Sequence, residues 1–449
     1  METAQLSELM KECGITGAGG AGFPAHMKLC RRVKTIILNC AECEPLFCLH
    51  RQLLQSRAYE VLSAFYELGT ALGAKRMIVA IRKSFRAAAD AVQEYLGLYG
   101  EMELKLLEDV YPAGDEVVLI YEATGEIVPP GGLPADVGAA VFNVETVYNL
   151  YRAVTYHEPV TDKLVMIGGE IEHPMTIRIP LGMSVREATA FAGRILVEDP
   201  VYLIGGAMMG RPAGADEVVT RTTNAIIVLP QNHPVIMKKR KNTGIDLKRT
   251  AAACCQCSMC TDLCPRNLLG HPIDPARFML AAACKDVRKP DIFIHTMFCS
   301  SCGLCEMYSC PQGLSPGTLI TEYKNRLQEA GIPLRKETAG PLNPAREYRK
   351  VPILRLAARI GLMPYLKKAP LIEGRVKAER VRIPLREESG IFARPAVKAG
   401  DFAKRGQVIG VPADERSTAV HASISGRILE ANDRFVMIEA VRKDVQADE

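Results

Sequence analysis

Two runs of cysteine in residues 254–310 have a spacing that suits iron–sulfur chemistry. Each run places three cysteines at intervals of three positions and ends on a fourth cysteine that is followed by proline. Three thiolates at this spacing wrap one iron–sulfur cube, and the fourth ligand comes from elsewhere in the chain. The sequence therefore predicts two [4Fe-4S] clusters, whose ligands are Cys254, Cys257, Cys260, Cys264, Cys299, Cys302, Cys305 and Cys310.

We expect the last cysteine of each run to ligate the other cluster, as in bacterial ferredoxins. Cys310 then completes the set of Cys254, Cys257 and Cys260, while Cys264 completes the second set. This crossing would keep the two clusters close enough for electron transfer. Two structural zinc sites are the alternative, but zinc sites typically use two separated C-x2-C pairs, so the spacing favours iron–sulfur clusters.

A glycine-rich stretch near the N-terminus, TGAGGAGFP (16–24), has the composition of a phosphate-binding loop. Gly17, Gly19 and Gly22 fit the pattern G-x-G-x-x-G. The dinucleotide fingerprint of that form needs a strand directly before the glycines. Here a helical stretch precedes them, and the β-rich segment TIILNC (35–40) follows. The stretch is therefore a weak match to a dinucleotide site.

The same loop nevertheless has the properties that an anion requires. Gly17, Gly19, Gly20 and Gly22 allow backbone N–H groups to approach a phosphate closely. We expect a helix from about Ala25 to point its N-terminus at the anion, and Lys28 to add a positive charge.

The first 155 residues alternate helical and β-rich stretches, which is typical of an α/β domain with parallel crossovers. The β-rich runs cover 35–40 and 76–81, and helical periodicity covers 59–73 and 84–97.

The later segments differ in composition and in their predicted secondary structure. Residues 156–240 predict a small α+β module, in which a strand, a turn and a strand precede a helix that starts near Ser184. The cysteines lie among short helical pieces in residues 245–330, and residues 331–376 are rich in proline and basic residues, typical of a linker with one short helix. Short strands broken by turns predict an all-β module over 377–449.

Composition and charge exclude several classes of protein. The chain has 449 residues and a net charge of +5, which is close to balanced for its length. The basic run KKRK (238–241) lacks interleaved aromatic residues, so we interpret it as a solvated loop and expect no nucleic-acid partner. No apolar run approaches the roughly 18 residues that a membrane span needs, and the N-terminus lacks the features of a secretory signal. Ten of the 15 cysteines lie between 254 and 310, which indicates metal binding in a reducing compartment.

Several motifs in sequence order resemble known electron-transfer proteins. They are GAGGAGFP (17–24), NCAECEP (39–45), YPAGDE (111–116), FNVETVYN (142–149) and GGAMMG (205–210). The first four resemble the flavin-binding subunit of respiratory NADH dehydrogenase and the C subunit of the Rnf ion-pumping complex. The whole order of modules is most similar to the cobalamin reductases of propanediol-utilisation microcompartments. In the Rnf protein the barrel-sandwich module is N-terminal, whereas here the corresponding segment is last.

This resemblance implies a multidomain α/β fold. A Rossmann-like FMN domain (1–155) would precede a β-grasp domain of the SLBB type (156–240) and a helical two-cluster ferredoxin-like domain (245–330). After the linker (331–376), a barrel-sandwich domain similar to lipoyl carriers (377–449) would close the chain. Carrier domains need a lysine at the hairpin tip, where this chain has HASISG, so a docking or structural role is implied instead.

The resemblance also implies FMN as the resident cofactor, NADH as a substrate that stacks over the flavin, and no separate catalytic side chain. The residues implied around the flavin phosphate and ring are Gly17, Gly19, Gly20, Gly22, Lys28, Asn143 and Thr146. Those implied near the ring and the nicotinamide are Asn39, Glu42 and Glu44, and Asp115 and Glu116 stand where the dehydrogenase has a pair of glutamates. Ala41 and Asp115 depart from that family, which has Asp and Glu there. Phe23 is a candidate stacking platform or, equally, a core residue.

The implied function is an NADH-dependent cobalamin reductase. Electrons would pass from NADH to FMN, to the two clusters, and to cob(III)alamin and cob(II)alamin, because a flavin accepts a hydride and releases single electrons. The resemblance implies an adenosyltransferase and a shell protein as partners, in the cytoplasm and inside a bacterial microcompartment. Three alternatives stay open: an Rnf C-like electron-transfer protein docked on a membrane complex, a relay to another reductase, and a corrinoid or ligand sensor.

Overall fold

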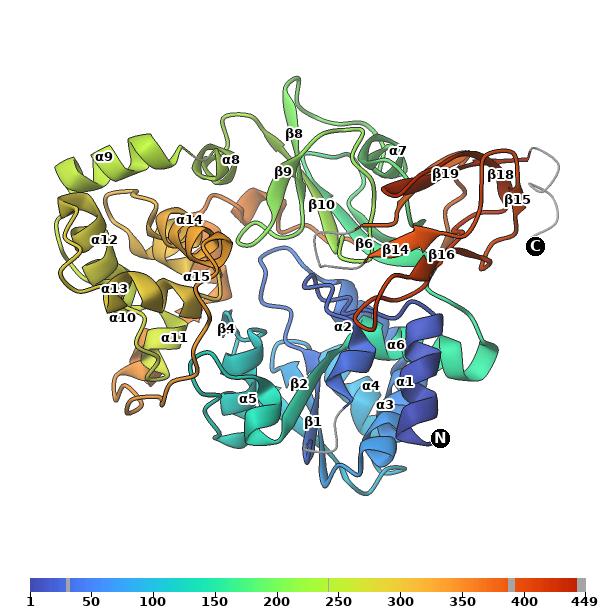
Figure 1. The fold of residues 1–449 in the computed structure, drawn as a ribbon, viewed down its shortest axis with the longest axis horizontal. Helices are drawn as coiled ribbons and strands as arrows, with labels where there is room; N and C mark the ends of the chain where they lie inside the picture. Colours follow the sequence, from blue (N-terminus) through green and yellow to red (C-terminus); the bar gives the residue numbers. More distant parts are fainter. Residues whose placement is uncertain (30–32, 241, 387–391, 442–449) are drawn as a thin grey trace.

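Four modules make up the described chain, which is a computed structural model of residues 1–29, 33–240, 242–386 and 392–441 (Figure 1). The parallel-sheet module (3–156) lies at the bottom of Figure 1 and the mixed-sheet module (162–239) at the top. The cysteine module (243–329) lies on the left, and the C-terminal β module (380–440) on the right. The mixed sheets, the helical cysteine segment and the all-β end confirm the predicted multidomain α/β class.

The parallel-sheet module contains a four-stranded sheet in the order β3-β2-β1-β5, in which every pair of neighbours is parallel. Three consecutive residues of β1 (Ile36, Ile37 and Leu38) are fully buried because helices cover both faces of the sheet. The strands predicted over 35–40 and 76–81 and the helices predicted over 59–73 and 84–97 are confirmed. Its elements are α1 (Thr3–Glu12), η1 (Ala25–Lys28), β1 (Thr35–Cys40), α2 (Leu49–Ser56), α3 (Ala58–Leu72), β2 (Arg76–Arg82), α4 (Arg86–Leu96), β3 (Met102–Leu107), β4 (Val110–Tyr111), α5 (Glu116–Thr124), η2 (Pro134–Val137), β5 (Ala139–Asn143) and α6 (Val144–Tyr156).

The mixed-sheet module is built on a six-stranded sheet in the order β12-β7-β6-β10-β8-β9, in which β12 (Leu371–Arg375) comes from the segment after the cysteine module. Ser184 accepts a hydrogen bond from the Glu187 amide and forms a capping box, so the helix starts where the sequence predicts. The elements are β6 (Asp162–Gly169), β7 (Met175–Pro180), α7 (Val185–Ala190), β8 (Pro200–Ile204), β9 (Arg211–Ala213), β10 (Ala225–Pro230) and α8 (Pro234–Lys239).

The interpretation of the KKRK run as a solvated loop is wrong for its first two residues. Lys238 and Lys239 form the last turn of α8. The Lys238 ammonium donates to the carbonyl oxygens of Gly313 and Leu314, and Lys239 donates to those of Met208 and Gly210. These lysines therefore join α8 to the cysteine module and to the turn after β8. Lys241 lies outside the described residues.

The cysteine module consists of short helices connected by the two cysteine runs. Pro265 occupies the first position of α11, directly after Cys264, where its missing N–H costs no helical hydrogen bond. A small aromatic cluster of Phe278, Phe293 and Tyr323 fills the core. The elements are α9 (Thr243–Ala253), α10 (Met259–Asp262), α11 (Pro265–Leu268), α12 (Pro275–Cys284), α13 (Asp291–Ile294), η3 (His295–Phe298), η4 (Cys305–Ser309) and α14 (Pro316–Glu329).

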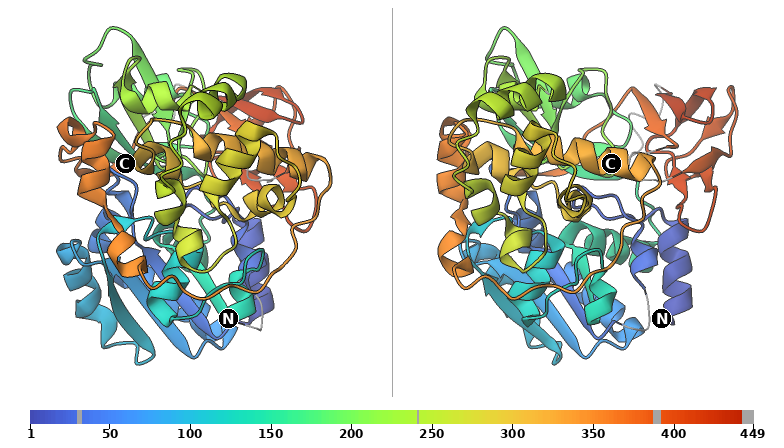
Figure 2. Two further views of the ribbon diagram at one scale, coloured as in Figure 1. Left: turned by 90° about the vertical axis from the view of Figure 1, so that its left-hand side faces the viewer. Right: turned by 60° about the vertical axis from the view of Figure 1, so that its left-hand side comes forward.

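Residues 331–376, expected as a linker, run between the cysteine module and the parallel-sheet module (Figure 2). The Glu337 amide donates to Pro130, the Gly340 amide donates to Gly270, and the last strand of the segment joins the mixed sheet beside β7. The segment thus contacts three modules. Its elements are η5 (Arg346–Arg349), β11 (Val351–Pro352), α15 (Ile353–Arg359), η6 (Met363–Tyr365) and β12 (Leu371–Arg375).

The C-terminal β module contains two small antiparallel sheets, β13-β19-β18-β15 and β14-β16-β17. The buried Arg221 side chain donates to Gly14, Thr418 and Ala419, so one guanidinium joins three modules. Within the described ranges, no helix is long and apolar enough to cross a membrane. The strands are β13 (Arg380–Pro384), β14 (Ala393–Pro395), β15 (Phe402–Ala403), β16 (Val408–Pro412), β17 (Val420–His421), β18 (Gly426–Ala431) and β19 (Phe435–Ala440).

Candidate functional site

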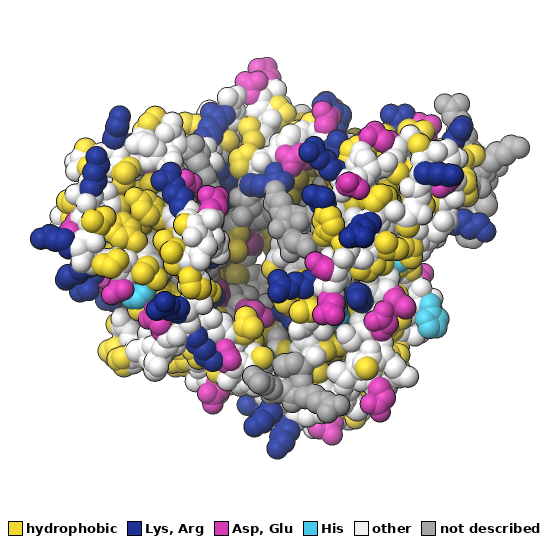
Figure 3. All heavy atoms as spheres, viewed as in Figure 1, with side chains coloured by type: hydrophobic (Ala, Val, Ile, Leu, Met, Phe, Trp, Pro, Cys, Tyr) yellow, Lys and Arg dark blue, Asp and Glu magenta, His cyan; other side chains and the backbone are white. Residues whose placement is uncertain are grey.

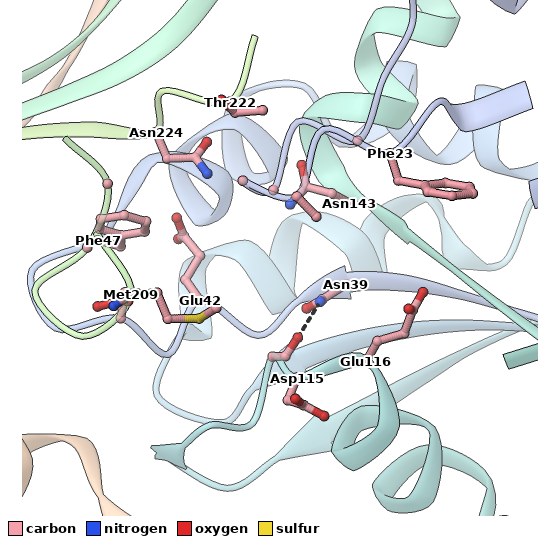
Figure 4. A pocket seen from close by; sticks show the side chains of 18 of the residues that line it. Phe23, Asn39, Glu42, Phe47, Asp115, Glu116, Asn143, Met209, Thr222 and Asn224 are labelled. Atoms are coloured by element: carbon pink, nitrogen blue, oxygen red, sulfur yellow. Dashed lines mark hydrogen bonds between the residues drawn. The ribbon is translucent and has the colours of Figure 1, made fainter. Parts of the chain in front are cut away.

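A cavity of about 780 Å³ lies where the four modules meet. The parallel-sheet module lines it with the glycine loop and with residues at the carboxyl ends of β1 and β5. The mixed-sheet module contributes residues 204–224, the cysteine module contributes Arg266 and Cys302, and the C-terminal β module contributes Arg386. Figure 4 shows labelled side chains that surround this space from several elements.

The glycine loop is a compact turn in which two backbone amides donate hydrogen bonds within the loop itself. The Gly17 amide donates to the Phe23 carbonyl at 2.8 Å, and the Gly22 amide donates to the Gly17 carbonyl at 3.1 Å. Gly20 and Gly22 have φ of +114° and +64°, conformations that only glycine adopts readily. A Cβ at Gly19 would lie 3.3 Å from the Asn143 amide nitrogen. The loop therefore forms a cradle that a side chain would fill, as a phosphate site requires.

The helix that points at this cradle is α6, and the expected helix from Ala25 is wrong. Residues 25–28 form one short 3-10 turn. Asn143 caps α6 by accepting from the Glu145 amide at 3.0 Å, and Thr146 in the first turn accepts from the Ala18 amide at 2.9 Å. The N-terminus of a 13-residue helix thus faces the loop and favours an anion there.

The opposite part of the cavity holds Lys28, Asn39 and Glu116. The Lys28 ammonium lies 3.0 Å from the Glu116 carboxylate and donates to the Val141 carbonyl at 2.8 Å. Asn39 donates to the Gly114 carbonyl at 3.1 Å, the contact drawn in Figure 4. Backbone carbonyls hold Lys28 and Asn39 in place beside β1, where these polar groups could bond to the polar edge of a flavin ring.

Glu42 and Glu44 line the cavity, but their carboxylates bind backbone amides. Glu42 accepts from the His50 and Arg51 amides at 2.8 and 3.0 Å, which caps α2. Glu44 accepts from the Met208 and Met209 amides at 3.0 and 2.8 Å. Burial raises the pKa of Glu44, and these two hydrogen bonds oppose that shift. The pair therefore fixes loops around the cavity, and Glu44 ties the parallel-sheet module to the mixed-sheet module.

Asp115 links the cavity to the cysteine module. It caps α5 by accepting from the Val117 and Val118 amides, and its second oxygen lies 2.9 Å from the Arg266 guanidinium. Both side chains are largely buried. The Tyr111 hydroxyl donates to the Cys302 carbonyl at 2.6 Å and makes a second link between the same modules.

We expect Asp115→Asn to weaken the contact between these two modules. Asparagine keeps the helix cap but leaves Arg266 without its anionic partner, at a cost of about 1–3 kcal/mol. The thermal unfolding midpoint of the cluster-loaded protein should fall, while Asp286→Asn, which breaks the exposed pair with Arg288, should have little effect. Equal midpoints for both variants would contradict the prediction.

The eight predicted cluster ligands separate into two groups around two further cavities. One cavity, of about 410 Å³, adjoins the first and is called the proximal cavity. The other, of about 150 Å³, is called the distal cavity. The proximal cavity is lined by Cys264, Cys299, Cys302 and Cys305. The distal cavity is lined by Cys254, Cys257, Cys260 and Cys310, together with Cys255.

The surroundings of these thiols suit iron–sulfur ligation. The Ser301 amide donates to Cys299 Sγ, and the Leu314 amide donates to Cys310 Sγ, each at 3.3 Å, and such bonds stabilise a thiolate ligand. Burial, followed by neighbouring thiols, raises the pKa of Cys260 to about 12. Burial likewise raises the pKa of Cys264 to about 12. Cluster assembly must therefore displace protons from these groups.

Phe23 lies at the edge of the glycine loop and is 47% exposed, so it is not a core residue. In Figure 4 its ring points away from the other labelled side chains.

Sequence reasoning missed several polar residues around the cavity of about 780 Å³, here called the flavin cavity. His50, on α2, accepts from the Asn143 amide at 3.2 Å. Lys163 and Asn224 approach from the mixed-sheet module, and Arg266 approaches from the cysteine module. Arg266 stands two positions after a cluster cysteine, which is a signal that could have been used. His50 and Lys163 lie in ordinary helix and strand patterns, and Asn224 lies directly before a strand, so none of the three carries such a signal.

Three family descriptions match successive parts of the chain. They are the Nuo51 FMN-binding domain over residues 10–152, the 4Fe-4S dicluster domain over 253–315, and the RnfC barrel sandwich hybrid domain over 363–446. With the cradle and the two thiol groups, these matches assign FMN and [4Fe-4S] chemistry to the chain, which is an oxidoreductase. The dicluster match favours iron–sulfur over the zinc alternative.

Curated relatives match almost the whole chain. "Cobalamin reductase PduS" of Salmonella typhimurium is 38% identical, with 97% of this chain and 96% of the relative covered. The protein of the same name from Citrobacter freundii is 37% identical, with 96% of each covered. The C subunit of the ion-translocating oxidoreductase complex of Erwinia tasmaniensis is 31% identical over 60% of this chain and 33% of that protein. A solved structure of NAD+-reducing [NiFe]-hydrogenase in the H2-reduced state has a TM-score of 0.47 and 20% identity, over 74% of this chain and 63% of that one. The chain therefore belongs to the cobalamin reductase PduS family.

Proposed function

We propose that this protein is an NADH-dependent cobalamin reductase that carries electrons from NADH through FMN and two [4Fe-4S] clusters to cob(III)alamin and cob(II)alamin. The observation that carries the proposal is the overlap of the flavin and proximal cavities. Arg266, Ser300 and Cys302 line both of them. Bound FMN would accept a hydride and pass on single electrons, as a hydride donor and a cobalt acceptor together require.

The chain's own residues have distinct tasks in this proposal. Gly19 and Gly20, with Asn143 and Thr146, border the flavin phosphate at the N-terminus of α6, while Gly17 and Gly22 shape the loop through their hydrogen bonds within it. Lys28, Asn39 and Glu116 line the ring, while Glu42, Glu44 and Asp115 fix the surrounding loops. The proximal set, Cys264, Cys299, Cys302 and Cys305, holds the cluster next to the flavin. The distal set, Cys254, Cys257, Cys260 and Cys310, holds the second.

We place the exit of electrons at the distal cavity. Cys257 is exposed there, and so is Leu280, which also lines the cavity. Hydrophobic side chains gather over the cysteine module on the left of Figure 3, and exposed Ile245 and Val287 belong to the same module. We propose that the corrinoid docks on this surface, where its methyl groups would contact the exposed apolar side chains. An adenosyltransferase that receives the corrinoid, and a shell protein of a cytoplasmic microcompartment, complete the proposal as partners.

The proposed module boundaries follow the predicted ones. We propose that residues 156–240 form a β-grasp domain of the SLBB type and that residues 377–449 form the barrel-sandwich domain. A mixed sheet with one covering helix supports the first assignment, and the family match over 363–446 supports the second.

An anaerobic spectroscopic experiment tests the function. The protein is reconstituted with iron, sulfide and FMN, NADH is added, and the visible spectrum is followed before and after addition of aquocobalamin. Bleaching of flavin and clusters followed by formation of cob(II)alamin is expected. Bleaching without cobalt reduction would indicate another acceptor, and no bleaching by NADH would contradict the proposal.

A further inference from the structure

We infer that the flavin phosphate is held from two modules, with Asn224 of the mixed-sheet module as an additional phosphate ligand. The family description for FMN binding covers residues 10–152 only, so it assigns no role to this module. The inference rests on the proposed flavin site. It makes the mixed-sheet module part of the cofactor site as well as its neighbour.

Asn224 lies directly opposite the glycine cradle. It is the residue before β10, is only 3% exposed, and lines the flavin cavity. A Cβ built on Gly20 would lie 3.5 Å from Asn224 Nδ2. Figure 4 shows Asn224 and Thr222 reaching from the green mixed-sheet segment into the space that Asn143 borders on the other side. An anion in the cradle would therefore lie between two asparagine side chains.

The orientation of the Asn224 amide follows from a buried lysine. Lys163 Nζ donates to Asn224 Oδ1 at 2.7 Å. An ammonium group has only donors, so the oxygen of Asn224 must face Lys163, and the NH₂ group faces Gly20. A donor aimed at the cradle suits a phosphate oxygen.

The charge of Lys163 is balanced by a buried carboxylate. Lys163 is 1% exposed and pairs with the Glu145 carboxylate, which is 0% exposed. The second oxygen of Glu145 accepts from the Leu164 amide at 2.8 Å. Because this pair is neutral overall, the attraction for an anion comes from the α6 N-terminus and from the amide donors. Phosphate binding would thus connect α6 and the residue before β10 across the boundary between the modules.

The test compares two flavins that differ only in the phosphate. FMN and riboflavin are titrated, by flavin fluorescence, into flavin-depleted full-length protein with its clusters in place. Asn224→Asp keeps the shape and a partner for Lys163, but it turns a donor into a carboxylate that repels phosphate. We expect the Kd of FMN to rise by about 100-fold in Asn224→Asp and about tenfold in Asn224→Ala, while the Kd of riboflavin changes by less than about twofold.

Asn325→Asp, on the exposed face of α14, is the matched control and should bind both flavins like the wild type. An unchanged Kd for FMN in Asn224→Asp would overturn the inference. Equal losses for FMN and riboflavin would also overturn it, because the substitution would then act on the cavity as a whole. Wild-type protein that binds neither flavin would instead overturn the proposed function, and this inference with it.

Discussion

Replacing Cys264 with alanine is expected to remove the cluster next to the flavin, although Cys264 belongs to the first cysteine run. Cys264 lines the proximal cavity with three cysteines of the second run. Loss of one of four thiolates should prevent stable assembly there and reduce the bound iron by about half. NADH should still bleach the flavin, but cobalt reduction should be lost, because the distal cavity does not adjoin the flavin cavity through shared residues.

Electron paramagnetic resonance of the reduced protein distinguishes the two clusters and checks this assignment. Cys302→Ala should lose the same signal as Cys264→Ala, whereas Cys260→Ala should lose the other one. Cys284→Ala is the control, because Cys284 is exposed and lines neither cavity. If Cys264→Ala and Cys260→Ala removed the same signal, the crossed ligation would be wrong.

Replacing Lys163 with methionine is expected to be the most destabilising single change around the flavin cavity. The substitution leaves the Glu145 carboxylate buried without its cationic partner. Breaking a buried ion pair in this way costs about 3–5 kcal/mol. The double variant Lys163→Met with Glu145→Gln removes both charges and should recover part of the loss. Thermal unfolding midpoints of the wild type and the two variants measure this order, and a double variant less stable than the single one would contradict it.

The destabilisation caused by Lys163→Met depends on pH in a direction that follows from the pKa of Glu145. Burial alone would raise the pKa of Glu145, but the Lys163 ammonium, assisted by His50, lowers it to about 2. A folded-state pKa below the ordinary 4.5 means that this stabilisation is complete above about pH 4.5 and is lost as the pH falls toward 2. In Lys163→Met, burial without the ammonium raises the pKa of Glu145, so protonation of this carboxyl removes part of the destabilisation.

The difference in unfolding midpoint between wild type and Lys163→Met should therefore be larger at pH 8 than at pH 5. Unfolding scans at the two pH values check the sign. The double variant has no carboxylate at position 145, so its difference from Lys163→Met should shrink as the pH falls. A gap that widens toward pH 5 would show that Glu145 is not the group left unpaired.

Cysteine spacing and local β-rich runs could be interpreted from the sequence because their information is local. Thiols three positions apart must fall on one tight loop, and six residues such as TIILNC form a buried strand by composition alone. The same argument explains why Ser184 was recognisable as a helix cap. The flavin residues were inferred only from resemblance, since the glycine loop by itself matched no complete fingerprint.

The helix that faces the glycine loop could not be predicted from the local sequence. The segment after Pro24 makes one 3-10 turn, and α6 supplies the helix N-terminus from residues more than a hundred positions away. The Ala18 amide meets Thr146 only because β1 and β5 are neighbours in the sheet. The spacing of residues along the chain cannot predict a contact between segments that are so far apart in the sequence.

The sequence by itself determined the kind of chemistry, because the number, type and local spacing of thiols and glycines restrict which cofactors the chain binds. The tertiary structure decided how those parts are connected. Asn224 lies beside the glycine loop and binds Lys163. Glu42 and Glu44 accept hydrogen bonds from backbone amides. Cys302 lines both the flavin cavity and the proximal cavity. The physical reason is that buried charges and polar groups must find partners, and those partners come from whichever module the packing brings near.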